Sequence, residues 1–220
     1  MYCENEKKEV LGMEIYNLYP GSWASNCYVL LGDGQNGRRP AAVVDPSADA
    51  ASIVQFLNKH NARLEYILLT HGHFDHVMAL DDLRDLTGAP AYVHKEDNEM
   101  LSDGEKNAYS FFFGKQKRWR EADKLLEDGE ILTLGGETLK VLSTPGHSKG
   151  SVCFLTGDKL ITGDTIFAHG YGRYDLHGGN ASRLAESLSG LQALDQTLTV
   201  YPGHGDEARL KDALDAIRYL

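Results

Sequence analysis

The stretch Leu68–Leu80, LLTHGHFDHVMAL, places three histidines and an aspartate directly after an apolar run. His71 and His73 are two positions apart, so their side chains point the same way if the chain stays extended there. Asp75 and His76 come where the chain would turn into the next helix, so they can face a second point nearby. Imidazole and carboxylate groups are ligands that suit zinc, and also iron or manganese. The stretch therefore predicts a metal site at the end of a strand.

The alternative interpretation is that these histidines are ordinary surface residues, which is the simplest explanation for any single one. Three histidines with Asp75 in six positions weaken that interpretation. Burying such a group without a metal would remove several titratable side chains from water with no evident partner.

Three further polar residues each follow an apolar run elsewhere in the chain. His147 lies in the Pro-Gly turn of TPGHSKGS, Asp164 in GDTIF, and His204 in YPGHGDE. Taken singly, such Gly-rich motifs are often no more than turns. Together with the first stretch they bring five histidines and two aspartates to strand ends, a pattern typical of metal or catalytic sites.

Strand and helix patterns alternate along the chain and predict the α/β class. We expect one domain over residues 1–220, in which two mixed sheets are stacked and helices cover both outer faces. A less regular, charged segment at about 95–128 is interpreted as an insertion or lid. Strands are predicted at 13–19, 26–32, 41–45, 64–70, 90–94, 131–134, 137–143, 151–157, 159–163 and 198–201, and helices at about 48–61, 77–86, 181–194 and 206–220.

Composition narrows the classes of partner. The formal charge of −10 disfavours nucleic acid as a partner. No apolar run approaches the roughly 20 residues that cross a bilayer, and the charged start MYCENEKKEV does not resemble a secretory signal, so we expect a cytoplasmic protein without a membrane partner. Cys3, Cys27 and Cys153 lack CxxC spacing, which argues against a disulfide framework or a cysteine zinc site, and we expect Cys27 and Cys153 to be buried strand residues.

The order HGHFDH, His147, Asp164, His204 resembles the metallo-β-lactamase superfamily, and the resemblance runs from about Met13 to Glu207. Within it, GDTIFAHGYGRYDLHGGN and the final PGHG are similar to the glyoxalase II (hydroxyacylglutathione hydrolase) branch and its shorter relatives. The resemblance implies a four-layer αββα sandwich with the metals held between the sheet edges.

The resemblance also implies two divalent metal ions, zinc first, with iron or manganese as alternatives. A hydroxide that bridges them would open a thioester of a small thiol, such as an S-hydroxyacyl adduct. Asp75 is expected to be catalytic as well as a ligand. The implied ligands are His71, His73 and His147 for one metal, and Asp75, His76 and His204 for the other, with Asp164 between the two.

Departures from the family pattern bear on the substrate. Common metallo-β-lactamases carry Cys where this chain has Asp164, which disfavours β-lactam hydrolysis. Only 16 residues follow His204, so we expect a short form without the C-terminal helical domain that holds glutathione in full-length glyoxalase II. Arg173 matches a basic position of the family's glutathione site, whereas Asp175 stands where Tyr is usual. The acyl group and the thiol carrier are left open.

Three alternative functions share this pattern. One is an oxidoreductase like the persulfide dioxygenases, which use a single iron; His204 weighs against it because it completes a second site. Another is lactone hydrolysis by the same metal chemistry. The third is a di-iron electron-transfer module, and Gly72 weighs against it because that group places a carboxylate ligand there.

Candidate substrate contacts are Arg173, Tyr171, Lys117 and Arg118. The last two lie in a basic run around Trp119, which is either a solvated loop or a cap over the metal site that meets an anionic substrate tail.

Four other histidines are assigned lesser roles. His60 and His94 end a helix and a strand and are expected to be structural, whereas His169 and His177 flank GYGR and are weaker candidates for substrate contact.

Overall fold

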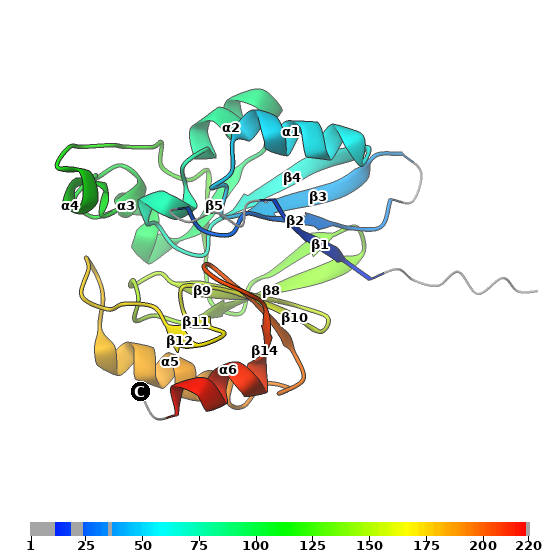
Figure 1. Ribbon diagram of the computed structural model, residues 1–220. Helices are drawn as coiled ribbons and strands as arrows, with labels where there is room; N and C mark the ends of the chain where they lie inside the picture. The colour runs from blue at the N-terminus through cyan, green and yellow to red at the C-terminus, as the bar shows by residue number, and fades with distance from the viewer. Residues whose placement is uncertain (1–11, 19–23, 35–36, 219–220) are drawn as a thin grey trace, which may run out of the picture.

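A computed structural model describes residues 12–18, 24–34 and 37–218 of the chain. Four layers are stacked: helices α1 and α2, a six-stranded sheet, a second six-stranded sheet, and helices α5 and α6 (Figure 1). The predicted α/β sandwich of two mixed sheets between helices is therefore confirmed. Cys3 and the predicted end of the last helix at 219–220 lie outside the described residues.

The first sheet has the order β1-β2-β3-β4-β5-β6. Its first three strands pair antiparallel, and β3 to β6 pair parallel, so the carboxyl ends of the parallel strands meet at one edge. Ligand residues that follow such strands share that edge. The strands are β1 Glu14–Asn17, β2 Tyr28–Leu31, β3 Arg39–Val44, β4 Ala62–Leu68, β5 Ala91–His94 and β6 Lys124–Leu126.

The second sheet has the order β14-β13-β10-β9-β8-β7 and is also mixed, since only β10 and β13 pair parallel. A separate hairpin, β11 and β12, lies beside it. The sequence patterns predicted neither this hairpin nor β14, because each strand has only two residues. The strands are β7 Ile131–Leu134, β8 Glu137–Ser143, β9 Val152–Thr156, β10 Lys159–Gly163, β11 Ile166–Phe167, β12 Gly170–Tyr171, β13 Thr199–Pro202 and β14 Ala208–Arg209.

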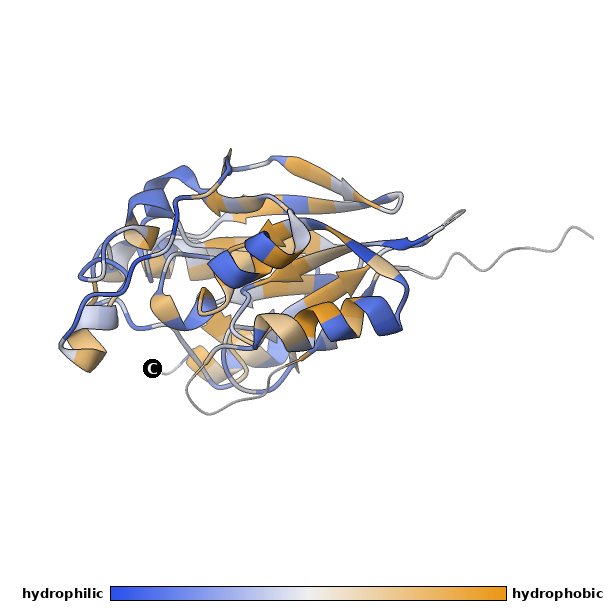
Figure 2. Ribbon diagram, turned by 90° about the horizontal axis from the view of Figure 1, so that it is seen from above, coloured by the Kyte–Doolittle hydropathy of each residue, from blue (hydrophilic) through white to orange (hydrophobic). Residues whose placement is uncertain are grey.

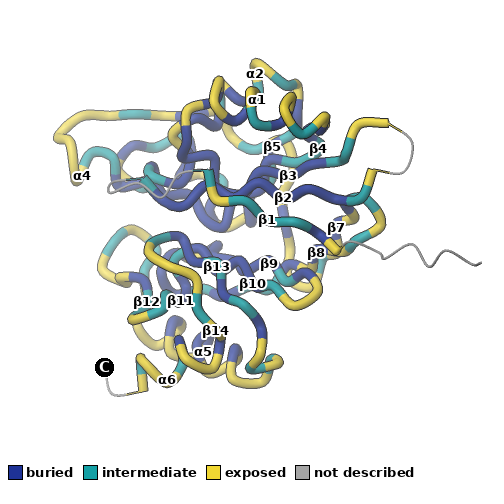
Figure 3. The backbone as a smooth tube through the Cα atoms, turned by 45° about the vertical axis from the view of Figure 1, so that its right-hand side comes forward, coloured by how far each residue is buried: buried dark blue, intermediate teal, exposed yellow. Residues whose placement is uncertain are grey.

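The core follows from the alternation of side chains along each strand. Tyr28 and Leu30 face the space between the sheets, whereas Val29 and Leu31 face the layer of α1 and α2. Strands with apolar residues on both faces are expected when both faces are covered. Figure 2 shows the apolar colour concentrated on the strands, and Figure 3 shows most of the strand residues buried. Cys27, one residue before β2, and Cys153, in β9, are buried as predicted.

The long helices begin and end near the predicted positions. α1, Ala50–Lys59, begins after Asp49, whose carboxylate accepts a hydrogen bond of 2.9 Å from the amide of Ser52. α2, Leu80–Thr87, starts three residues later than predicted, because a 3-10 turn precedes it. α6, Leu210–Ile217, also starts late, since β14 takes the preceding residues. α5 spans Ala181–Leu191.

The segment at about 95–128 is more regular than its sequence suggested. It contains the 3-10 turn Lys95–Asp97, the short helices α3 Asn98–Leu101 and α4 Tyr109–Phe113, and the edge strand β6. Figure 1 shows α3 and α4 at one end of the molecule. Among the described residues, no helix has the length and apolar character required to cross a membrane.

Candidate metal centre

The histidine-rich loop leaves the first sheet at the carboxyl end of β4. The chain bends at Thr70 and His71, is extended at His73, and then forms the 3-10 turn Phe74–His76, which turns the second pair of polar side chains away from the first. Gly72 separates the first pair, and a Cβ there would lie 2.8 Å from Cβ of Met100 and 3.0 Å from the backbone oxygen of Asp97. Only glycine fits this position without displacing the neighbouring backbone.

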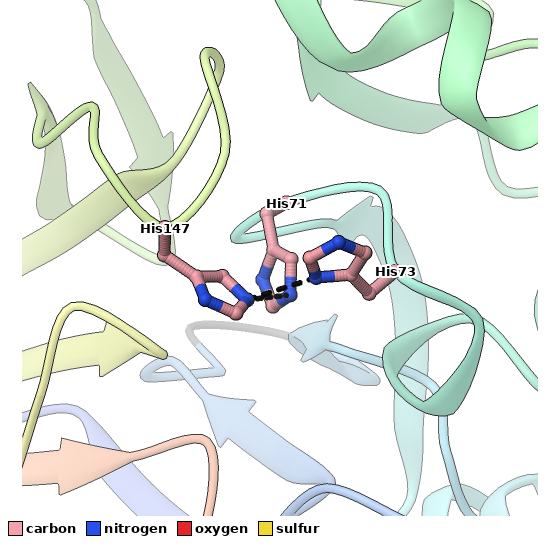
Figure 4. Close-up of side chains that lie close together, drawn as sticks. All are labelled: His71, His73 and His147. Atoms are coloured by element: carbon pink, nitrogen blue, oxygen red, sulfur yellow. Dashed lines mark hydrogen bonds between the residues drawn. The ribbon is translucent and has the colours of Figure 1, made fainter. Parts of the chain in front are cut away.

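Three histidine rings meet at the first point. Nδ1 of His73 lies 2.8 Å from Nε2 of His147, which lies 3.1 Å from Nε2 of His71 (Figure 4). All three side chains are buried. Nitrogen ligands of a tetrahedral zinc ion lie roughly 3.3 Å apart at ordinary bond lengths. The three rings therefore have the spacing of a metal site, although His147 comes from the loop after β8.

The second point collects one ligand-type atom each from Asp75, His76 and His204, all within 4.8 Å of one another. Nε2 of His204 lies 3.2 Å from Oδ2 of Asp75, and Nε2 of His76 lies 3.9 Å from the same oxygen. His204 follows β13 and is the most exposed of the three, at 38 % of its side chain. This point therefore opens toward solvent.

Asp164 lies between the two groups. Its Oδ1 is 3.3 Å from Nε2 of His76, and its Oδ2 is 3.6 Å from Nε2 of His147 and 3.7 Å from Nε2 of His204. One carboxylate thus contacts both histidine groups. The structure brings together all seven side chains that the sequence nominated.

The donor atoms fit divalent metal ions better than they fit one another. Nε2 of His76 and Oδ1 of Asp164 are buried and lie 3.3 Å apart, but they do not form a well-oriented hydrogen bond with each other or with other described residues. At the first point three ring nitrogens face each other, and a neutral imidazole cannot satisfy two acceptors with one proton. Buried polar atoms without partners are costly, so a cation shared by these atoms would remove the cost.

Asp45 orients the second group from behind. Its carboxylate accepts hydrogen bonds from the amide and hydroxyl of Thr70, at 2.8 and 2.7 Å, and lies 2.8 Å from Nδ1 of His76. A ring that donates from Nδ1 presents Nε2 as the free ligand atom. This role was not predicted from the sequence, since Asp45 stood there only as the last residue of the strand predicted at 41–45.

The first group has similar supports. Nδ1 of His71 lies 3.1 Å from the Thr70 hydroxyl, which is itself bonded to Asp45. Nδ1 of His147 lies 2.6 Å from the backbone oxygen of Arg173. Each ring can donate from Nδ1 to these oxygens, so Nε2 of both rings is left as an acceptor pointing at the first point.

Asp97 links the two loops that supply this group. Its buried carboxylate accepts hydrogen bonds from the amide of Gly72 at 3.0 Å, the amide of Gly150 at 2.7 Å and the hydroxyl of Ser148 at 2.6 Å. The sequence did not predict that Asp97 holds these loops together, because the segment at about 95–128 has no regular pattern. Its position three residues after the strand ending at His94 is the signal that could have found it.

Protonation in the metal-free chain matches ligand chemistry at three ligands and differs at His76. Burial, reinforced by the other histidines, holds the pKa of His71 well below its usual value and lowers the pKa of His73 to about 3. Burial raises the pKa of Asp164, but His76 and the nearby histidines outweigh it and hold that pKa below its usual range. Neutral imidazoles and ionised carboxylates are the forms that bind metal. Burial lowers the pKa of His76, but Asp164 and Asp45 outweigh it and hold that pKa well above its usual value, so a metal would have to displace a proton from this ring.

The sequence profile of the metallo-beta-lactamase superfamily matches residues 20–204. The chain belongs to this superfamily. One relative, the probable metallo-hydrolase YqgX of Bacillus subtilis, is 37 % identical over 190 residues, which cover 85 % of this chain and 88 % of YqgX. The function of the chain is therefore of the metallo-hydrolase type that this superfamily carries out with divalent metals.

Solved structures of the superfamily agree with the fold. The structure of BLEG-1, described as a B3 metallo-beta-lactamase, is 33 % identical, with a TM-score of 0.83 over 94 % of this chain and 99 % of BLEG-1. The protein TTHA1623, solved in a di-iron-bound form, is 29 % identical, with a TM-score of 0.78 over 93 % of this chain and all of TTHA1623. Among these three relatives, TTHA1623 is the one whose description names a metal, and that metal is iron.

A cavity of about 320 Å³ opens beside the two groups of nominated ligands, which together form the metal centre. Five of the seven nominated ligands line it, and so does Arg173. Tyr171 instead packs against the core beneath α5 and α6. Lys117 and Arg118 are not among the described residues that line the cavity, and the ammonium of Lys117 lies 4.8 Å from the centre of the Trp119 ring.

The remaining histidines have the contacts expected of minor roles. His60 stacks on Phe56 at a centroid distance of 4.2 Å, and Nδ1 of His94 accepts a hydrogen bond from the amide of Glu96, so both contacts are structural. Nε2 of His177 lies 3.8 Å from Oε1 of Glu99, and neither His177 nor His169 lines the described cavity.

Proposed function

We propose that this chain is a dinuclear metal hydrolase that opens a thioester of a small thiol. The observation that carries the proposal is the position of Asp164, whose carboxylate lies within 3.7 Å of nitrogens from both histidine groups. A shared carboxylate is expected where two cations lie side by side. The similarity of GDTIFAHGYGRYDLHGGN and PGHG to the glyoxalase II branch supports the thioester.

The proposed ligands keep the assignment implied by the sequence. His71, His73 and His147 would hold one ion, and Asp75, His76 and His204 the other, with Asp164 shared. Two bound divalent cations would supply a hydroxide near neutral pH and polarise the carbonyl that it attacks. We propose zinc because nitrogen and carboxylate oxygen donors suit it, with iron or manganese as alternatives.

Asp75 is the proposed catalytic residue among the ligands, since it lines the cavity beside the exposed His204. Burial raises its pKa, but His76 and the hydrogen bond from His204 hold that pKa below its usual value. The carboxylate is therefore ionised at neutral pH. It can accept a hydrogen bond from a water molecule and so orient the oxygen that reacts.

The decisive test is Asp75→Ala, with Asp82→Ala as the matched control on the exposed face of α2. Metal content and hydrolysis of a thioester panel that includes S-lactoylglutathione should be measured for both. We expect Asp75→Ala to lose turnover and to retain close to one ion per chain, while Asp82→Ala behaves as the parent. Full activity of Asp75→Ala would overturn the proposal.

β-Lactam hydrolysis is a second candidate, favoured by the similarity to BLEG-1 over almost all of both chains. A chromogenic cephalosporin in the same panel separates the two. Oxygen uptake with a thiol persulfide and one iron per chain would instead indicate the dioxygenase alternative, and turnover of lactones alone would indicate a lactonase.

The single domain over residues 1–220, the cytoplasmic location and the lack of nucleic-acid or membrane partners stay predictions from the sequence.

A further inference from the structure

Apart from the nominated ligands and Arg173, the residues that line the cavity beside the metal centre are apolar. The other side chains that line it, among the described residues, come from Phe74, Phe112, Phe167 and Leu176, together with Ala108, Gly172 and Arg173. Only Arg173 among these carries a polar group. A substrate that reaches the metal centre must therefore place its adjacent atoms against aromatic and aliphatic surface.

Phe112 lines this cavity and is partly exposed to solvent. It lies in α4, is 43 % exposed, and its ring centre is 5.5 Å from that of Phe74. Its neighbours Phe111 and Phe113 are 66 % and 48 % exposed. Contiguous exposed apolar surface of this kind is unfavourable in water unless a ligand or partner covers it. Its continuity with the cavity indicates that the ligand is the substrate.

Arg173 does not offer a free charge to an anionic substrate. Its guanidinium makes two hydrogen bonds to the carboxylate of Asp175, at 2.7 and 2.9 Å. The same group lies 5.7 Å from the ring centre of Phe111 and 5.9 Å from that of Phe112. A guanidinium that lies over aromatic rings extends the apolar wall, and here two of its five N–H donors and its charge are already paired with Asp175.

We propose that the substrate carries an uncharged, apolar group next to the scissile carbonyl or its sulfur, and that this group packs against Phe74, Phe112, Phe167 and Leu176. The inference rests on the proposed hydrolase and names its substrate class. It differs from the hypothesis that Lys117 and Arg118 meet an anionic tail, and from the reading of Arg173 as a basic residue of a glutathione site. Glutathione, which carries two carboxylates, is a poor match for this wall.

A series of N-acetylcysteamine thioesters tests the acyl side. Acetyl, butyryl and hexanoyl esters should show kcat/KM rising about threefold to fourfold for each methylene that the cavity buries. Lactoyl and succinyl esters should fall below the butyryl ester. A second series of acetyl thioesters, made from phenylmethanethiol, N-acetylcysteamine and glutathione, tests the sulfur side. A rise of kcat/KM with apolar size in either series supports the inference and shows whether the apolar group lies on the acyl side or the sulfur side of the thioester.

Variants of the wall separate packing from general damage. Phe112→Ala should reduce the rise of kcat/KM with acyl-chain length. Phe111→Ala, whose side chain is not among those lining the cavity, should preserve that rise. Arg173→Leu should change the succinyl and butyryl esters by the same factor. A selective loss for the succinyl ester would show that Arg173 receives anions and would overturn the inference.

The failures of the two proposals are distinguishable. Thioester turnover without an apolar preference in either series overturns the inference and leaves the hydrolase intact. Absence of all thioester turnover by protein that holds two metals overturns the hydrolase. Calorimetric binding of the non-hydrolysable ketone analogues then decides the inference, because a hexanoyl analogue that binds no tighter than the succinyl analogue would overturn it.

Discussion

Nδ1 of His76 lies 2.8 Å from Oδ2 of Asp45, and both side chains are buried. The carboxylate also holds Thr70, whose hydroxyl lies beside the ring of His71. Asp45 is thus connected to both histidine groups without lying in the cavity. The contact sets which nitrogen of His76 is free to bind metal, and its loss should be visible in metal affinity.

Asp45→Asn should weaken metal binding at the second group by about 10-fold to 100-fold. The amide keeps the shape of the side chain but removes the charge and one acceptor, so the Nδ1 proton of His76 is held less firmly. Competition with a calibrated chelator measures the affinity. Asp49→Asn, a helix cap that Asn satisfies equally well, is the control. Unchanged affinity in Asp45→Asn would show that the contact does not tune the ligand.

Asp97→Asn should destabilise the fold by about 2 kcal/mol, because an amide nitrogen would replace one oxygen that accepts buried hydrogen bonds from Gly72, Gly150 and Ser148. Metal affinity of the first group should fall with it, since both of its loops are attached to this carboxylate. Urea denaturation and chelator competition provide the two readouts. The neighbouring exposed variant Glu96→Gln should behave as the parent in both.

Metal-free protein should lose stability as the pH falls from 6.5 toward 3. Burial, followed by the effect of His147, lowers the pKa of His73 to about 3 from its usual 6.5. Within this window the unfolded chain binds a proton at His73 that the folded chain does not, so the free energy of unfolding decreases as the pH drops. Urea denaturation at pH 7 and pH 4.5, after chelation, measures the fall. His73→Gln should show a smaller fall than the parent, and an equal fall would contradict the assignment.

Gly172→Ala should lower kcat/KM by about a hundredfold, because a Cβ at this position would clash with the backbone oxygen of Asp164 and lie 2.9 Å from Nδ1 of His147. Gly170→Ala, two residues earlier in the hairpin that precedes Gly172, meets no atom within 4 Å and is the matched control. Steady-state kinetics of both variants, at full metal loading, checks the prediction. Similar activities would mean that the hairpin adjusts without moving the ligands.

Much of the fold was accessible from sequence patterns because they are local. The strands at 131–134, 137–143 and 159–163 were predicted to the residue, since each is a short run rich in apolar residues beside glycine turns. The edge strand β6 was missed because its burial pattern depends on its neighbour β5 rather than on its own residues. The late start of α6 has the same cause, since pairing of Ala208 and Arg209 with β13 prevents an earlier helix.

The sequence by itself determined which donor groups are present and their spacing, because HGHFDH carries its ligands on one short loop that a single strand delivers. Only the tertiary structure decided that His147, Asp164 and His204 meet that loop, and that Asp45 and Asp97 lie behind it, since these contacts join residues far apart in the chain. It also decided the character of the cavity. The positive charge of Arg173 can be read from the sequence, because an arginine is charged in any fold. What that charge can bind depends on its pairing with Asp175 and on the rings of α4.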